Sequence, residues 1–158
     1  MKLLTLVSLM LASSLTFSYT AEFPKNPVGT LTPGSLCERA SEYRYPEQIA
    51  YCKRDVSSTQ KRDIFEDYRG LGFNLDPRKR SSYKIDHYIP LCAGGSNRDD
   101  NLWPQHISIY TITDPMEGLG CEKLLAAKIK QKELVRLIKL VKNDLSKATS
   151  TIRYLQSL

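Results

Sequence analysis

One short stretch of the sequence brings together residue types that can hydrolyse phosphodiesters. Asp86 stands beside His87, one of two histidines, and Asn101 follows that histidine by fourteen positions across a Gly94-Gly95 turn. A neutral imidazole, with an unperturbed pKa of about 6.5, is a suitable base for taking a proton from water. A neighbouring carboxylate can hold a divalent cation against a phosphate, and hard oxygen ligands favour Mg²⁺. The asparagine side chain can orient the imidazole or ligate the metal through its carbonyl oxygen.

The ordered motifs around this stretch resemble a known family. They are, in chain order, Asp86-His87, Pro90-Leu91, Gly94-Gly95 and Asn101-Leu102-Trp103-Pro104-Gln105. This set is similar to the HNH endonucleases of the His-Me finger, or ββα-metal, superfamily. The resemblance implies a β-hairpin packed on a helix, one bound divalent metal ion and hydrolysis of DNA or RNA strands. Carried over residue by residue, it makes Asp86 the first metal ligand, His87 the general base and Asn101 the residue that supports the base.

The last metal ligand departs from the family pattern. Such blocks usually end in a histidine at the position that is Tyr110 in this chain. Four residues are candidates for the missing ligand: His106, Asp114, Glu117 and Glu122. His106 is the other imidazole of the chain, and oxygen ligation by Glu117 suits magnesium. We therefore expect one divalent ion, most simply Mg²⁺, held by Asp86 together with His106 or Glu117.

The charge of the chain indicates a polyanionic partner. Lysine and arginine number 23 against 17 aspartate and glutamate residues, and the formal net charge is +6 at pH 7. A basic chain attracts nucleic acid. Four basic residues near the Asp86 strand are expected to contact its phosphates: Arg78, Lys79, Arg80 and Lys84. The expected activity is cleavage of DNA or RNA with little sequence preference, because contacts to the backbone carry no sequence information.

The sequence alone also allows two other functions. The same hairpin on a basic chain fits a secreted module that binds nucleic acid or another polyanion without cutting it. An exported toxin with a partner immunity protein is the second, although the short chain with its own signal argues against it.

The first residues have the pattern of a secretory signal. Lys2 precedes an apolar run from Leu3 to Ala12, and small residues follow. The run is shorter than the roughly 20 residues that span a membrane. We expect residues 1–21 to be a signal peptide, 22–36 an extended linker and 37–158 a single nuclease domain. The chain would be exported to the periplasm or the medium, and its mature form would have no membrane attachment.

The four cysteines fit an oxidising compartment. Cys37, Cys52, Cys92 and Cys121 all lie after the signal, and none of them forms the CxxC spacing of a structural zinc site. Of the three possible connectivities we favour Cys37 with Cys52 and Cys92 with Cys121, because each bridge then closes a short local loop.

Apolar spacing and turn residues predict the elements that position these groups. The expected elements are a helix from Ser57 or Ser58 to Gly70 or Gly72, a strand from Tyr83 to Ile89, a glycine loop over 93–100, a return strand over 101–103, and helices from Glu122 onward with a break between Lys130 and Lys132. The fold class expected is α+β: a small ββα-metal core with flanking helices, braced by disulfides.

Overall fold

The computed structural model describes residues 21–158, so the signal peptide expected over residues 1–21 lies outside the described residues except for Ala21. The helices and strands are, in chain order, β1 (Glu42–Arg44), β2 (Ile49–Tyr51), α1 (Ser58–Gly70), β3 (Tyr83–His87), β4 (Leu102–His106), α2 (Ile107–Leu125), α3 (Gln131–Asn143) and α4 (Ala148–Ser157). The strands form two antiparallel pairs, β1 with β2 and β3 with β4. The expected α+β class is confirmed.

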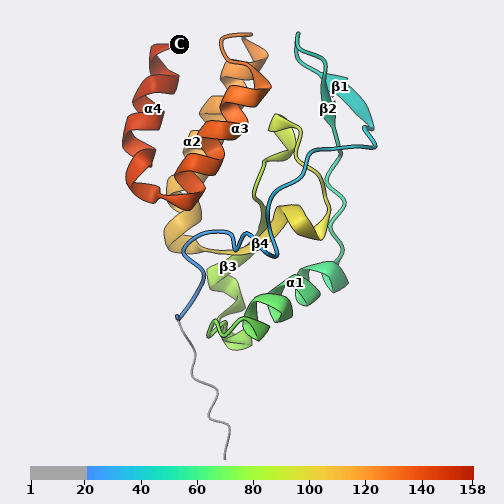
Figure 1. Cartoon of the computed structure of the whole chain (residues 1–158), viewed down its shortest axis with the longest axis vertical. Helices are drawn as coiled ribbons and strands as arrows, with labels where there is room; N and C mark the ends of the chain where they lie inside the picture. The colour runs from blue at the N-terminus through green and yellow to red at the C-terminus, as the bar shows by residue number, and fades with distance from the viewer. Residues whose placement is uncertain (1–20) are drawn as a thin grey trace, which may run out of the picture.

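The β3–β4 hairpin lies between α1 on one side and the helices α2, α3 and α4 on the other (Figure 1). Its register pairs Asp86 with Trp103 and His87 with Leu102, and α2 begins directly after β4. Strand β3 ends at His87 instead of Ile89. The chain beyond it turns away, although the Tyr88 backbone N–H still donates to the Asn101 carbonyl over 2.7 Å.

The loop between the two strands needs its glycine pair. Gly94 has a φ of +83°, in the left-handed region that favours glycine. A Cβ on Gly95 would lie 1.8 Å from the carbonyl oxygen of Ile89, so only glycine permits this close approach of two backbone segments. The loop is thereby folded back onto the end of β3, which brings its polar residues beside His87.

Helix α1 has the expected start and end. The Ser57 side chain caps it by accepting from the Gln60 backbone N–H over 3.1 Å. The apolar face of Ile64, Phe65 and Tyr68 is buried. The Gln60 side chain does not complete a capping box, because its amide donates to the Asn97 carbonyl over 2.8 Å. Helix α1 therefore also supports the glycine loop.

Helix α2 begins earlier than the sequence pattern indicates. Helical spacing is expected only from Glu122 onward, whereas α2 starts at Ile107 and contains Pro115. Proline and glycine lower helix propensity, but tertiary packing overrides it here. Gly120 is buried against α3, where a Cβ would lie 2.3 Å from a methyl carbon of Leu134. A break between two helices is present as expected, but it covers residues 126–130 and not 130–132, since α2 ends at Leu125 and α3 begins at Gln131.

Two apolar clusters enclose the hairpin. One contains buried residues of α2, α3 and α4, together with Ile49 and Ile89. The other contains residues of α1, β3 and β4, with Trp103 at 0% exposure. The segment over 22–36 packs on this second cluster through Phe23, and the Thr32 hydroxyl donates to the Leu102 carbonyl over 2.9 Å.

Both disulfides have the expected pairing, Cys37 with Cys52 and Cys92 with Cys121. The second bridge joins the turn after β3 to α2. Within residues 21–158, no helix combines the length and the apolar composition needed to cross a membrane.

Candidate active site

The neighbours Asp86 and His87 have separate surroundings. Successive side chains of a strand point to opposite faces. Asp86 accordingly shares its face with Lys84 and meets residues of α2 and α3, whereas His87 meets Arg54 and Asn97. The two groups remain within electrostatic range: burial lowers the pKa of His87, and the Asp86 charge partly opposes that shift. The β3 strand therefore carries a carboxylate site on one face and an imidazole site on the other.

The carboxylate site joins Asp86 to Asp114 and Glu117 of α2. One oxygen of each lies within 4.8 Å of the others. Two ammonium groups already contact these carboxylates. Lys84 Nζ lies 2.7 Å from Asp114 and 3.6 Å from Asp86, and Lys142 Nζ lies 2.7 Å from Glu117 Oε1 and 3.4 Å from Asp86 Oδ2. Two positive charges thus balance most of the negative charge.

Lys142 of α3 is the most deeply buried of these groups, with 0% exposure. Its ammonium also donates to the His87 carbonyl oxygen over 2.5 Å. Burial alone would lower the pKa of Lys142, but the carboxylates of Glu117 and Asp86 outweigh it and raise the pKa. Burial raises the pKa of Glu117 to about 7, despite the neighbouring ammonium. For Asp86 the charges of Lys142 and Lys84 prevail over burial and lower the pKa.

The donor set of this site fits a hard divalent cation. Three carboxylates at this spacing supply the oxygen ligands that Mg²⁺ prefers. The ammonium groups of Lys142 and Lys84 lie against the same oxygens, so a bound cation has to share them or displace the lysines. Asp86, Asp114 and Glu117 are thus the residues that could hold a metal ion.

The imidazole of His87 is held at both nitrogens and is 3% exposed. Nε2 lies 3.0 Å from Asn97 Oδ1, and Nδ1 lies 3.3 Å from an Arg54 guanidinium nitrogen. The Asn97 amide group donates to the Lys53 carbonyl, which leaves its oxygen as the acceptor. Nε2 therefore carries the proton, and the lone pair of Nδ1 faces Arg54, which can only donate. Burial lowers the pKa of His87 below 6.5, against the opposing effect of the Asn97 hydrogen bond.

Asn101 does not support His87, and this corrects the role that the resemblance implied. Its side chain is fully buried and makes its hydrogen bonds to the backbone of the loop. Oδ1 accepts from the Ile89 N–H over 2.8 Å, and Nδ2 donates to the carbonyls of Ile89 and Ser96 over 3.0 and 2.9 Å. Asn101 thus holds closed the loop that carries Asn97, and Asn97 makes the direct contact with His87.

His106 does not reach the carboxylate site, and this corrects its place among the expected ligands. It pairs with Tyr83 at the far end of the hairpin, three register steps from Asp86. Its ring stacks on Phe23 with centroids 4.0 Å apart, and Nδ1 caps α2 by accepting from the Ser108 N–H. Glu122 is exposed on α2 and does not belong to the group.

The basic residues expected to bind phosphate are engaged within the protein. Arg78 pairs with Asp76 at 3.1 Å, Lys79 lies 3.8 Å from Glu22, and Arg80 covers the Phe65 ring. Lys84 belongs to the carboxylate site. The residues that the sequence reasoning missed are Arg54, Asn97 and Lys142. A signal exists for Lys142 only, since it continues the buried row of Leu134 and Ile138 at steps of four.

No family model, curated protein or solved structure matches this chain.

Proposed function

We propose that the protein is an endonuclease that hydrolyses phosphodiester bonds of DNA or RNA, with His87 as the general base. The observation that carries the proposal is the arrangement at His87. Asn97 fixes the proton on Nε2, and the basic nitrogen Nδ1 faces a guanidinium that can bind a phosphate. A neutral base beside an anion-binding group is the minimum needed to direct water at phosphorus.

Arg54 has to move away from His87 before the imidazole can act as a base. It covers Nδ1 in the free protein and also donates to the Ile85 carbonyl over 3.2 Å. A phosphodiester offers the guanidinium a bidentate, charge-assisted pair, which is stronger than its contact with a neutral nitrogen. Binding of the phosphate thus turns Arg54 away from Nδ1. The nitrogen is then free to take a proton from water, and Asn97 stabilises the imidazolium that forms.

The carboxylate site is a candidate metal site on the other face of β3 from the imidazole. Asp86, Asp114 and Glu117 would hold one divalent cation, Mg²⁺ by preference. Because the strand separates it from His87, such an ion would add positive charge to the field at the bound phosphate without contacting it. The order β3, β4, α2, with Asp86 and His87 at the end of β3, is consistent with a ββα-metal core of the HNH type. The two disulfides are consistent with export to the periplasm or the medium.

A second function is favoured because the imidazole is buried and the carboxylates are already paired. His87 is 3% exposed, and Lys142 neutralises the carboxylates that a metal needs. Both features fit a secreted module that binds nucleic acid without cutting it.

Plasmid cleavage separates the two functions. The oxidised protein is incubated with supercoiled plasmid in Mg²⁺ or in EDTA, beside His87→Ala and the control His106→Ala, which removes the other imidazole. An endonuclease nicks the plasmid in Mg²⁺, loses at least about 100-fold in rate with His87→Ala, and retains its rate with His106→Ala. Plasmid that is shifted on a gel but left intact across several divalent ions contradicts the endonuclease and supports the binding module.

A further inference from the structure

A groove opens on the face of the molecule beside Arg54. Two adjoining cavities of about 430 and 390 Å³ share Arg39, Cys52 and Asn97 as lining residues. Lys53, Arg54 and Arg98 complete the cationic lining, and we call this surface the Arg39 groove. His87 does not line it and lies behind Arg54 and Asn97. The groove therefore leads to the imidazole site, on the face of β3 opposite the carboxylates.

The groove carries an excess of uncompensated positive charge. Its lining has four cationic residues and two acidic ones, Glu38 and Asp55. Glu38 lies 3.9 Å from Arg98, which also pairs with Asp100 at 3.3 Å. Within residues 21–158, the side chains of Arg39 and Lys53 have no acidic partner within 4.0 Å. Among the lining residues, the positive charges without an acidic partner are therefore those of Arg39, Lys53 and Arg54, against one unpaired carboxylate, Asp55.

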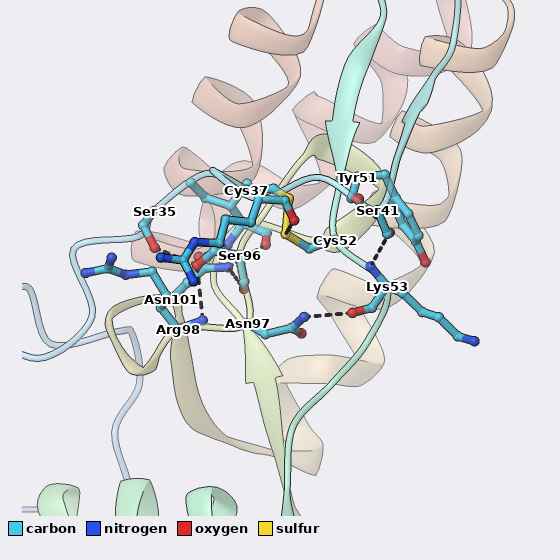
Figure 2. The surroundings of a disulfide bond; sticks show 12 residues. Ser35, Cys37, Ser41, Tyr51, Cys52, Lys53, Ser96, Asn97, Arg98 and Asn101 are labelled. Carbon is cyan, nitrogen blue, oxygen red and sulfur yellow. Dashed lines mark hydrogen bonds between the residues drawn. A yellow bond between two sulfur atoms is a disulfide. The ribbon is translucent and has the colours of Figure 1, made fainter.

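The backbone at Cys52 and Lys53 is held in place by a disulfide and by hydrogen bonds. The Cys37–Cys52 disulfide ties the segment before β1 to the residue that precedes Lys53, as Figure 2 shows. The Lys53 N–H donates to the Ser41 hydroxyl over 3.2 Å, and the Lys53 carbonyl accepts from Asn97 over 2.8 Å. The same Asn97 holds His87. The backbone that carries these cations thus keeps a constant position relative to the imidazole, which lowers the entropy cost of binding an extended ligand.

The lining also indicates what kind of ligand binds. It contains no aromatic side chain, whereas proteins that grip single strands stack bases on aromatic rings. We propose that the Arg39 groove binds the sugar-phosphate backbone of duplex nucleic acid, with Arg39 and Lys53 on phosphates that flank the one held by Arg54. This inference rests on the proposed function for the role of Arg54. It assigns phosphate contacts to residues other than the expected Arg78, Lys79 and Arg80.

Binding in the absence of cleavage tests the groove. Fluorescence anisotropy with a labelled 20-base-pair DNA duplex and with the 20-mer single strand is measured in EDTA over a range of salt concentrations. The variant is Arg39→Ala/Lys53→Ala. The control is Lys128→Ala/Arg153→Ala, which removes the same two charge types from exposed positions outside the groove. Unfolding temperatures of both variants are compared with the wild type, so that a loss of fold is recognised.

The groove variant is expected to bind the duplex at least 10-fold more weakly. The slope of log K against log salt should fall by about 1.8, because each lost phosphate contact reduces it by about 0.9. The control should keep both values, and the duplex should bind at least as tightly as the single strand. Equal losses in the groove variant and the control, or a clear preference for the single strand, overturn the proposal. Binding in EDTA requires no cleavage, so the groove proposal stands or falls separately from the endonuclease proposal.

Discussion

The ammonium of Lys142 lies 2.7 Å from Glu117 Oε1, inside the group of carboxylates that could hold a metal ion. The lysine comes from α3 and the glutamate from α2. The packing of these two helices places both charged groups in the interior. A buried ion pair of this kind is costly to break from one side, because the remaining charge has no partner. Lys142 therefore acts as the internal counter-ion of the carboxylate site.

Replacing Lys142 by methionine should destabilise the protein and make it dependent on metal. We expect the free energy of unfolding to fall by about 3 kcal/mol at pH 8. The loss should be smaller at pH 6, because Glu117 is then protonated in both proteins: its pKa is about 7 beside Lys142 and rises further without the ammonium. Mg²⁺ should restore part of the stability, since the cation replaces the ammonium. Urea unfolding with and without Mg²⁺ measures this, with exposed Lys132→Met on the same helix as control. A Lys142→Met protein as stable as the control in EDTA contradicts the counter-ion role.

The pH dependence of cleavage should separate the two sites. Burial lowers the pKa of His87 below 6.5, so more than half of the base is neutral at pH 6.5 in the free protein. The acid limb of kcat/KM at saturating Mg²⁺, which reports the free protein, should therefore lie below pH 6.5. The Mg²⁺ concentration needed for half-maximal rate should rise already as pH falls through about 7, because Glu117 is then protonated. Rates measured from pH 5 to 9 at several Mg²⁺ concentrations test both statements. An acid limb of kcat/KM above pH 7 argues against His87 as the base.

The two asparagines of the loop should have different roles. Asn97→Ala removes the acceptor of His87 Nε2–H and should lower kcat by about 10-fold or more, because the tautomer is no longer fixed. Asn101→Ala removes three buried hydrogen bonds and should cost about 2 to 4 kcal/mol of stability. Kinetics and urea unfolding of both variants are the measurements. The assignment of roles is reversed if Asn101→Ala folds normally and loses kcat while Asn97→Ala retains it.

Removing the Cys37–Cys52 bridge should weaken binding as well as stability. The bridge closes a separation of 15 residues, for which the chain-entropy estimate is about 3 kcal/mol. Cys37→Ser/Cys52→Ser should also bind the DNA duplex several-fold more weakly in EDTA, because Lys53 and Arg54 follow the bridge directly. Cys92→Ser/Cys121→Ser is the matched control, since that bridge lies away from the groove. Similar binding losses in both variants, measured below their unfolding temperatures, would show that the effect is general.

Local features of this chain could be predicted from sequence because their causes lie within a few residues. Helix α1 starts at a capping serine, the hairpin turns at two glycines, and each disulfide closes a short loop. The start of α2 could not be predicted in this way. Its Pro115 and Gly120 are unfavourable for a helix locally, and only the contact with α3 makes them acceptable.

The sequence by itself determined that a carboxylate and an imidazole stand side by side at Asp86 and His87, with Glu117 as a further carboxylate downstream. Only the tertiary structure decided what each of them meets. The alternation of side chains along β3 sends the two neighbours to opposite faces. Packing then brings Arg54 and Asn97 to His87, from 33 and 10 residues away in the chain. It brings Lys142 to Asp86 from 56 residues away. Such contacts depend on how distant segments fill a common core, and no local pattern encodes that.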